Sequence, residues 1–497
     1  MIRRVLVANR GEIALRVMRA CRAMGIGTVA VYSDADAEAP HVATADRAVR
    51  IGPPPARDSY LNIPVLIEAA RRTNADAVHP GYGFLSENAA FARACEEARL
   101  TFIGPPSGVI ARMGSKPSAR ETMRAAGVPV VPGTTPRSQT DADLERAASE
   151  AGYPLLLKAA AGGGGKGMRA VRSSAELSDA IGGARREAER AFGDGTLYVE
   201  RLVEHARHVE VQILADAHGS TVHLFERDCS LQRRHQKVIE ESPAPTLAPG
   251  VRGRLTRAAV DAARAVGYVN AGTVEFLLHG SGESAEFYFL EMNTRLQVEH
   301  PVTEAVTGLD LVQAQLLVAA GERLLFRQDD IRTSGHAVEC RVYAEDPSRL
   351  LPQSGRLLRY REPALGGIRV DSGVREGQTI TAHYDPMLAK LIAHAPTRAS
   401  ALEAATSALR TFEILGLHHN IPFLIELLGR PEVRAAEADT HFIDDRLEEL
   451  RTQPSPHLIS AAAAVAAMAA GRGQAVAIGS ATSAGLDPWQ TIGPIAW

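Results

Sequence analysis

Two acidic residues on neighbouring predicted strands are the first candidates for chemistry. Glu275 lies in the alternating run Thr273–Leu277, and Glu291 lies in the run that follows a Gly-Ser-Gly turn, with Asn293 on the same face. Two carboxylates that face each other across a hairpin repel unless a positive charge lies between them. Oxygen ligands of this kind suit Mg²⁺ or Mn²⁺ bound to nucleotide phosphates. The alternative is a solvated hairpin face, which the flanking phenylalanines disfavour.

Three polar residues alternate along the chain after this pair. Arg295, Gln297 and Glu299 occupy every second position, so an extended chain would point all three the same way. An arginine can hold an oxyanion, a glutamine can orient it and a glutamate can take its proton. A second polar run adds His235 and Lys237. Either run alone is compatible with a polar surface loop, but together with the carboxylate pair they predict an anion site with a general base.

Lysine is rare in this chain, and its positions indicate phosphate contacts. Lysine is a compact point charge that fits beside a phosphate, whereas arginine is a planar fork. Lys158 and Lys166 bracket a tetraglycine, residues 162–165, whose backbone can approach a phosphate closely. No Lys-Ser/Thr opens a helix there, which excludes a Walker P-loop, and a flexible linker is disfavoured between two apolar runs. The alternative is composition bias. Only five of the 55 basic residues are lysine: Lys116, Lys158, Lys166, Lys237 and Lys390.

The first part of the chain alternates short apolar runs with helical patterns. Val5–Ala8, Thr28–Tyr32 and Ala75–Val78 predict strands, and Leu61–Arg72 predicts a helix between two of them. Strands that alternate with helices predict an open parallel α/β sheet. The first turn, Asn9-Arg-Gly-Glu-Ile13, lacks G-x-G-x-x-G, so a dinucleotide-binding site is unsupported.

The chain divides into four segments by pattern. Residues 1–113 carry the predicted parallel sheet, and residues 114–330 carry the polar motifs, with a hinge at Pro129–Pro136 and a small mobile lid at about 131–202. Residues 331–447 form a further α+β module. Residues 448–497 are rich in alanine and proline, which predicts a linker with at most one weak helix. At 497 residues the chain should hold about three domains.

Composition and charge indicate a soluble globular protein with no nucleic-acid or membrane partner. The net charge is −3, which gives no basic footprint. The longest apolar stretch, around residues 459–470, is well short of the ~20 residues that cross a bilayer. The four cysteines are far apart, as expected of reduced, mostly buried thiols. No signal peptide precedes the first predicted strand, so we expect a cytoplasmic protein.

Six motifs closely resemble those of biotin carboxylases, which are ATP-grasp ligases. The resemblance covers residues 1 to about 447, and the motifs stand in the family's order. It implies an N-terminal open parallel α/β sheet, a central ATP-grasp domain with a mobile lid and a C-terminal α+β domain. The motifs are Asn9-Arg-Gly-Glu12, His79-Pro-Gly-Tyr-Gly-Phe-Leu-Ser-Glu87, Lys158 with Gly-Gly-Gly-Gly-Lys-Gly-Met168, Glu226-Arg-Asp-Cys-Ser-Leu-Gln-Arg-Arg-His-Gln-Lys237, Glu291-Met-Asn-Thr-Arg-Leu-Gln-Val-Glu-His-Pro301 and Val338-Glu-Cys-Arg341.

The resemblance implies ATP and two Mg²⁺ or Mn²⁺ ions as cofactors. Lys116 and Lys158 would contact the phosphates, and Glu200, Arg201 and Val203 would frame the adenine. The family usually has Lys and Leu at the last two positions, a change that main-chain contacts would tolerate. The metal ions would be held by Glu275, Glu291 and Asn293. The remaining nucleotide contacts would be Gly163, Gly164, Gly165, Lys166, Gly167, Met168, His208, Gln232, His235 and Leu277.

The implied reaction is a ligase reaction in two stages that forms a C–N bond. ATP would phosphorylate bicarbonate to carboxyphosphate, and the carboxyl group would pass to N1′ of biotin. Glu299 would deprotonate bicarbonate, Arg341 would stabilise the enolate of biotin, and Tyr82 would help to shape the biotin pocket. Phosphoryl transfer depends mainly on positioning and charge neutralisation. Bicarbonate would be held by Lys237, Arg295, Gln297 and Val298.

The resemblance also implies partners. Biotin would be a substrate, free or on a carrier domain or protein, and a carboxyltransferase subunit would complete the acyl-CoA carboxylase, with this chain as a homodimer or in a larger assembly. Asp487-Pro-Trp489 resembles the start of the biotin-transfer region in the biotin-bearing alpha subunits of methylcrotonyl- and propionyl-CoA carboxylases. We therefore expect a chain that stops before the carrier domain. No lysine follows a methionine, as in the family's Ala-Met-Lys-Met, so we expect no attached biotin.

Two other functions stay open from the sequence. Another ATP-grasp ligase, joining a carboxylate to an amine or thiol, would share the glycine loop and metal carboxylates but lack Arg295-Leu-Gln-Val-Glu299 with Arg341. A non-catalytic ATP-binding scaffold would lack a base or a metal ligand, whereas this chain has all of them. Bicarbonate-dependent ATP hydrolysis distinguishes the three.

Overall fold

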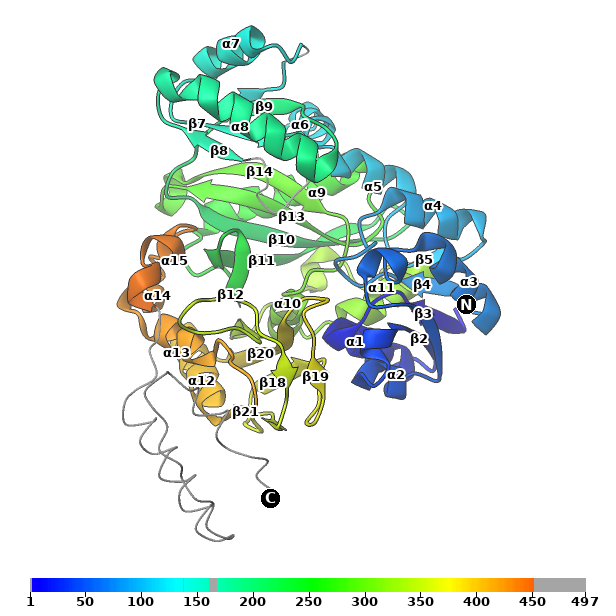
Figure 1. Cartoon of the computed structure of the whole chain (residues 1–497). Coiled ribbons are helices and arrows are strands. Elements are labelled where there is room, and N and C mark those ends of the chain that lie inside the picture. The colour runs from blue at the N-terminus through cyan, green and yellow to red at the C-terminus, as the bar shows by residue number, and fades with distance from the viewer. Residues whose placement is uncertain (1, 137, 161–167, 451–497) are drawn as a thin grey trace, which may run out of the picture.

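The structure is a computed structural model that describes residues 2–136, 138–160 and 168–450 (Figure 1). The N-terminal part is a five-stranded parallel sheet in the order β3-β2-β1-β4-β5, which confirms the predicted open α/β sheet. Apolar residues such as Val5, Val7 and Val29 have no exposed surface. Its elements are β1 Arg4–Val7, α1 Gly11–Ala23, β2 Gly27–Ser33, α2 Pro40–Thr44, β3 Arg47–Gly52, α3 Ile63–Thr73, β4 Ala77–His79, α4 Ala89–Glu97, β5 Thr101–Phe102 and α5 Ser107–Gly114, with short 3-10 turns η1 Asp34–Asp36 and η2 Ala56–Asp58.

A small four-stranded antiparallel sheet follows and stands apart at one end of the molecule (Figure 1). It has its own apolar core, which includes Leu144, Leu155, Val171 and Val199. A separate core is what a module that moves as a unit requires. The elements are β6 Gly133–Thr134, α7 Asp141–Ala151, β7 Leu155–Ala159, β8 Arg169–Val171, α8 Ser174–Phe192 and β9 Leu197–Arg201. The helix α6 Lys116–Ala125 precedes them and packs on α5, α9 and β14.

An eight-stranded sheet in the order β14-β13-β10-β11-β12-β15-β20-β18 spans the rest of the chain. It crosses the predicted 330/331 boundary, because β12 pairs with β15 and Glu240 faces Glu339. The predicted hairpin is confirmed, with Glu275 directly opposite Glu291. The strands are β10 Arg207–Ala215, β11 Thr221–Arg233, β12 Gln236–Ser242, β13 Asn270–His279, β14 Glu286–Asn293, β15 His336–Tyr343, β18 Ile368–Ser372 and β20 Met387–Ala395.

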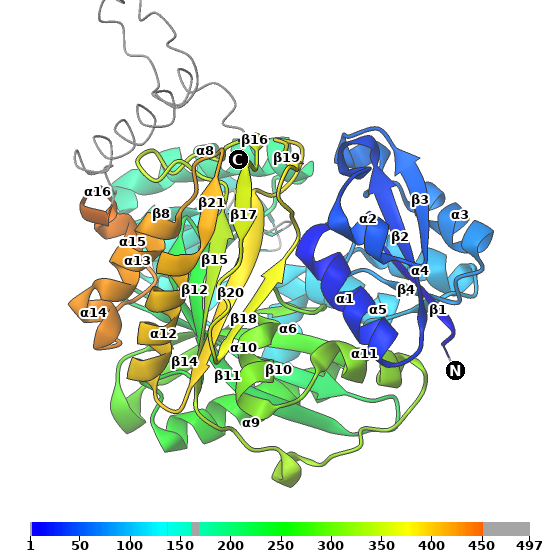
Figure 2. The same ribbon diagram turned by 90° about the horizontal axis from the view of Figure 1, so that it is seen from below.

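Helices cover both ends of this large sheet (Figure 2). α9 packs on β10 and β11, and α12 packs on β15 and β20. The helices are α9 Pro249–Val266, α10 His300–Thr307, α11 Leu311–Ala319, α12 Arg398–Thr411, α13 Ile421–Gly429, α14 Pro431–Arg434, α15 Phe442–Asp445 and α16 Leu447–Leu450. The remaining elements are η3 Gly282–Ser284, η4 Gln328–Asp330, β16 Gly355–Arg356, β17 Arg359–Arg361, β19 Thr379–Ile380 and β21 Glu413–Leu415.

Within the described ranges, no single helix has the length and apolar character to span a bilayer. α10 and α11 meet the criterion only as a pair, and the chain bends by 98° between them. All four cysteines are free and buried, as the sequence predicts.

Candidate active site

Lys237 lies at the centre of the site, among three carboxylates. Its Nζ is 2.5 Å from Glu210 Oε2, 2.9 Å from Glu275 Oε1 and 2.6 Å from Glu299 Oε1. These side chains come from β12, β10, β13 and the residue that precedes α10. Burial opposes the ammonium charge, but Cys229 and the three carboxylates outweigh it and raise the pKa of Lys237 well above its ordinary value. Lys237 is therefore a fixed positive charge.

Glu299, the predicted base, is held between two cations. Besides Lys237, Arg341 contacts it, with Nη2 3.0 Å from Glu299 Oε2. Arg341 is itself fixed by Glu240, whose Oε1 accepts from Nε at 2.5 Å. Burial would raise the pKa of Glu299, but Lys237 and Arg341 outweigh burial and hold the pKa well below its ordinary value. The carboxylate is thus kept in the form that accepts a proton.

Glu275 is neutralised by protein side chains on both oxygens. Oε2 lies 2.9 Å from His208 Nε2, and Oε1 accepts from Asn293 Nδ2 at 2.8 Å and Gln297 Nε2 at 3.0 Å, in addition to Lys237. Burial opposes ionisation, but Lys237 and His208 hold the pKa of Glu275 well below its ordinary value. Protein side chains therefore contact both oxygens of this carboxylate.

Glu291 has a different environment, although it faces Glu275 across the hairpin. No hydrogen bond or ion pair joins its carboxylate to another residue in the described ranges. Burial and the charge of Glu275 raise its pKa, and Lys116 opposes them. An oxygen ligand without a protein partner suits a hard divalent cation, so the residues present fit the predicted metal. With a cation bound, Glu291 would hold it, with Glu275 and Asn293 beside it.

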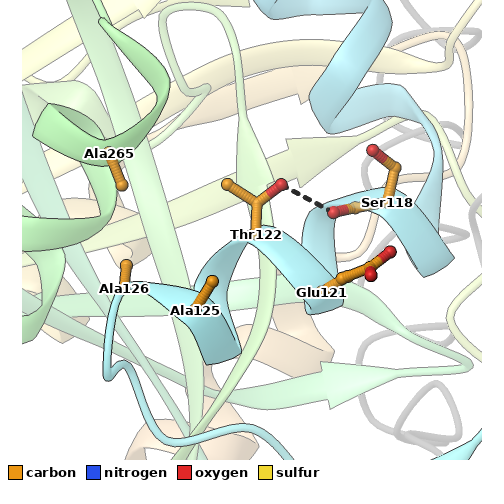
Figure 3. A pocket seen from close by; sticks show the side chains of 6 residues that line it. All are labelled: Ser118, Glu121, Thr122, Ala125, Ala126 and Ala265. Atoms are coloured by element: carbon orange, nitrogen blue, oxygen red, sulfur yellow. Dashed lines mark hydrogen bonds between the residues drawn. The ribbon is translucent and has the colours of Figure 1, made fainter.

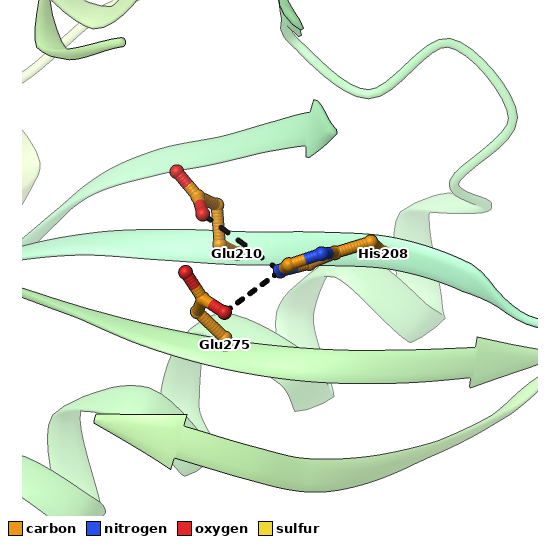
Figure 4. A group of neighbouring side chains, drawn as sticks. All are labelled: His208, Glu210 and Glu275. Atoms are coloured by element: carbon orange, nitrogen blue, oxygen red, sulfur yellow. Dashed lines mark ion pairs between the residues drawn. The ribbon is translucent and has the colours of Figure 1, made fainter. Parts of the chain in front are cut away.

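Two other sets of side chains have metal-like spacing. The ligand atoms of His208, Glu210 and Glu275, and those of Glu210, Cys229 and Glu299, lie within 4.8 Å of one another. Figure 4 shows the first set, with the three side chains pointing toward one another from β10 and β13. Lys237 contacts a carboxylate in both sets. The ammonium group supplies the positive charge that a metal would otherwise bring.

The segment from Arg295 to Glu299 is not the extended run that alternation predicted. β14 ends at Asn293, and the chain bends at Arg295 and turns at Val298 and Glu299 before α10 begins. A proline in the first turn of α10 favours this early helix start. The side chains nevertheless meet, because Arg295 Nη1 donates to Gln297 Oε1 at 3.0 Å and Nη2 donates to Asn293 Oδ1 at 2.9 Å.

Glu210 and Arg227 organise the site but were not singled out from the sequence. Glu210 has no exposed surface, and its Oε1 accepts from Arg227 Nε at 2.5 Å while Oε2 faces Lys237. Breaking a buried pair of this kind is costly because it leaves an unpaired charge. The signal was available, since Glu210 is an acidic residue inside an apolar strand pattern. Arg227 also donates to Gln212, Thr273 and Thr303.

The predicted phosphate lysine Lys158 lies away from this cluster, on β7. Its Nζ is 2.5 Å from Glu200 Oε2, and the same carboxylate also pairs with Arg120. Burial, followed by the charges of Lys116 and Arg120, lowers the pKa of Lys158 to about 7. One carboxylate therefore serves several cations, and the excess positive charge favours an anion such as a phosphate. Glu200, which was predicted to frame the adenine, pairs with Lys158 and Arg120 in the structure.

The other predicted residues are spread around the site. Tyr82 OH donates to Glu12, and Arg341 is among the charges that act on Tyr82. His235 is exposed in the turn between β11 and β12. Gln232 is buried. The predicted contacts at residues 163–167 lie outside the described residues. The partly exposed or exposed positions are Met168, Arg201, Val203 and Leu277.

A hollow of about 440 Å³ lies between α6 and α9 (Figure 3). It is open and lined by residues such as Ser118, Thr122 and Ala265. None of the predicted site residues lines it, so it carries none of this chemistry.

Three family descriptions match the chain. They are "Biotin carboxylase, N-terminal domain" at residues 1–110, "Carbamoyl-phosphate synthase L chain, ATP binding domain" at 115–326 and "Biotin carboxylase C-terminal domain" at 339–445.

Two named proteins match most of this chain. Biotin carboxylase 2 of Bacillus subtilis (strain 168) is 50% identical over 450 residues, 90% of this chain and 100% of that protein. The mitochondrial methylcrotonoyl-CoA carboxylase subunit alpha of Oryza sativa subsp. japonica is 53% identical over 445 residues, 89% of this chain but 60% of that protein.

Among solved structures, the biotin carboxylase domain dimer of Hydrogenobacter thermophilus 2-oxoglutarate carboxylase, in complex with MgADP, ADP and bicarbonate, matches with a TM-score of 0.87. It is 46% identical, and the match covers 91% of this chain and 100% of that one. With the fold, the site and these relatives in agreement, this chain belongs to the biotin carboxylase family.

Proposed function

We propose that this chain uses ATP and bicarbonate to carboxylate biotin, as the first half-reaction of a carboxylase. The observation that carries the proposal is Glu299, an ionised carboxylate held between Lys237 and Arg341. A proton acceptor between two fixed cations is suited to an anionic substrate that must lose a proton. Bicarbonate is such a substrate.

The cluster supports a defined order of events at bicarbonate. Lys237, Arg295, Gln297 and the Val298 main chain would bind the anion beside Glu299. Bicarbonate would share Lys237 and Arg341 with Glu299, which weakens their hold on the carboxylate and raises its pKa. Glu299 would then take the proton while bicarbonate oxygen attacks the γ-phosphorus of ATP, forming carboxyphosphate and releasing ADP.

The nucleotide would lie toward the small sheet. Lys158 and Lys116 would bind its phosphates. Glu291 would hold Mg²⁺, with Glu275 and Asn293 beside it, and the ion would supply positive charge against the phosphates. In the second stage, the carboxyl group would pass from carboxyphosphate to N1′ of biotin, releasing phosphate, which would take the N1′ proton. Arg341 would stabilise the negative oxygen of the biotin enolate. Glu240 keeps the guanidinium of Arg341 in place for this role.

The carboxyl acceptor in the parent assembly is a finer proposal. Relatives named as methylcrotonoyl-CoA carboxylase subunit alpha are longer than this chain, and a solved relative is a biotin carboxylase domain dimer. We propose that this chain acts on biotin held by a carrier domain or protein, works with a carboxyltransferase subunit and pairs with a second copy. Residence in the cytoplasm stays a prediction from the sequence.

The decisive experiment measures ATP hydrolysis by the purified chain with bicarbonate and biotin varied separately. We expect turnover to require bicarbonate and to increase with free biotin, with labelled bicarbonate recovered as carboxybiotin. Turnover with an amine or thiol acceptor instead would indicate another ATP-grasp ligase. ATP binding with no turnover under any condition would indicate a scaffold.

A further inference from the structure

Lys390 is the one lysine in the described ranges to which the resemblance gives no role. It lies on β20, in the large eight-stranded sheet. It has no exposed surface. Its Nζ donates to the Val298 carbonyl at 2.6 Å and lies 3.3 Å from Glu12 Oε1. A buried ammonium is expensive unless it is paired and hydrogen-bonded. Here its contacts go to the turn that carries the base and to the first helix of the chain.

The peptide geometry makes the Val298 contact informative. The Val298 carbonyl belongs to the same planar peptide unit as the Glu299 amide. A hydrogen bond that fixes this oxygen therefore also fixes the backbone from which the Glu299 side chain starts. Lys390 is also the direct cross-strand neighbour of Arg341 on β15. The buried Lys390 thus contacts the residue before Glu299 and stands opposite Arg341, one of the two cations that hold Glu299.

Glu12 connects this arrangement to the N-terminal sheet. α1 contacts β18 (Figure 1), and the approach is so close that a Cβ on Gly373 would lie 2.5 Å from the Glu12 amide nitrogen. Tyr82 OH donates to the same carboxylate that faces Lys390. The residues of the Tyr82–Glu12–Lys390–Val298 chain come from the N-terminal sheet region, β20 and the turn before α10.

We propose that Lys390 is a positioning residue: together with Glu12 it fixes the Val298–Glu299 peptide so that Glu299 points at the bicarbonate between Lys237 and Arg341. The inference rests on the proposed function. It also accounts for a lysine among so many arginines, because a slender stem reaches a buried carbonyl that a planar guanidinium fork would crowd.

The surrounding charges agree with this assignment. Burial opposes the charge of Lys390, but Glu12, Glu339 and Asp371 outweigh burial and raise its pKa. Both carboxyl oxygens of Glu339 are buried without a hydrogen-bond partner, and burial raises the pKa of Glu339 well above its ordinary value. Asp371 also pairs with Arg369. In the described residues, the direct polar contacts of the Lys390 ammonium are Glu12 and the Val298 carbonyl.

The test replaces Lys390 by Met, which keeps an unbranched apolar stem without the charge. Steady-state kinetics are measured with bicarbonate and ATP varied in turn, and nucleotide binding is measured directly. We expect kcat/KM for bicarbonate to fall about 100-fold, the loss that a small misplacement of a reacting group causes, with ATP affinity unchanged. A purely structural role would weaken direct nucleotide binding as well, or would lower only the melting temperature.

The matched control is Arg398→Met, which breaks a partly buried pair with Glu241. Within the described residues, this pair contacts none of the predicted site residues. This variant should lower the melting temperature and leave kcat/KM for bicarbonate and nucleotide affinity unchanged. If Lys390→Met does not fold, Glu12→Gln keeps the shape of the partner and should reduce kcat/KM for bicarbonate in the same selective way. Wild-type bicarbonate kinetics in either folded variant overturn the proposal, whereas an inactive wild-type chain would refute the proposed function instead.

Discussion

Glu275 and Glu291 are direct cross-strand partners on β13 and β14, yet among the described residues hydrogen bonds and ion pairs neutralise Glu275 and not Glu291. Burial and the neighbouring charge of Glu275 raise the pKa of Glu291. The hairpin therefore holds one carboxylate that belongs to the protein's own network and one that is available to a ligand. This asymmetry separates the roles of two residues that look equivalent in the sequence.

Glu291→Gln should weaken Mg²⁺-dependent nucleotide binding without destabilising the free protein. We expect a loss of about 10–100-fold or more in Mg²⁺ affinity, since even outer-shell partners of a metal cost that much. The melting temperature of the metal-free protein should stay or rise. A carboxylate whose pKa is higher in the folded state than in the unfolded state destabilises the fold at pH values above its unfolded pKa, and the substitution removes this destabilisation.

Titration of Mg²⁺ at fixed ATP checks the first expectation, and calorimetry in chelator checks the second. Glu275→Gln is the matched comparison. It should lower the melting temperature, because it leaves Lys237 and His208 with one fewer partner. Equal destabilisation by both substitutions would contradict the asymmetry.

Glu299→Gln should abolish most turnover while the fold and nucleotide binding persist. Loss of a positioned base costs about 10²–10⁴-fold in rate. Lys237 and Arg341 keep Glu210, Glu275 and Glu240 as partners, so the cluster should not collapse. The measurement is bicarbonate-dependent ATP hydrolysis. The control is Glu283→Gln, the same substitution at an exposed position. Turnover close to that of the control would remove Glu299 from the base role.

The strand register of the hairpin could be predicted from the sequence, but the local conformation of the segment after it could not. Strand alternation placed Glu275 opposite Glu291 correctly, because a hairpin register follows from its turn and its alternation. Alternation failed for Arg295–Glu299, where the chain turns into α10. Polar residues spaced by two converge there through a turn instead of a strand, and no local pattern distinguishes the two.

Some contacts of the site residues join positions that are remote in the chain. Glu240 contacts Arg341 over 101 positions, and Glu87 contacts Arg295 over 208. Burial of Glu240 follows from an eight-stranded sheet that joins two predicted domains, and periodicity within a single strand contains no such information. The boundaries of the four predicted segments stay predictions.

No lysine of this chain should accept biotin from a biotin ligase. Lys158 and Lys390 are buried, and Lys237 is enclosed by carboxylates, whereas a carrier lysine must be offered on an exposed turn. The purified chain is incubated with biotin ligase, ATP and biotin, with a biotin carrier domain as positive control. We expect an unchanged mass. A mass increase of one biotin, mapped to any of the five lysines, would show that the chain is its own carrier.

Nucleotide binding should take up a proton at Lys158. Burial, Lys116 and Arg120 lower its pKa to about 7 in the free protein, and a bound phosphate would raise it. Between the two pKa values the bound form holds more protons, so ATP affinity should fall as pH rises above about 7. Below pH 7 Lys158 is charged in both states, so its contribution to the affinity should become independent of pH.

Isothermal titration calorimetry at pH 8 in two buffers of different ionisation enthalpy measures this proton directly. The apparent enthalpies of MgATP binding should differ between the buffers for the wild-type chain. Lys158→Gln should bind more weakly and show a smaller difference, because the titrating ammonium is gone. The same substitution separates Lys158 from other groups whose protonation changes on binding. Identical buffer dependence in the two proteins would mean that Lys158 is not the group that takes up the proton.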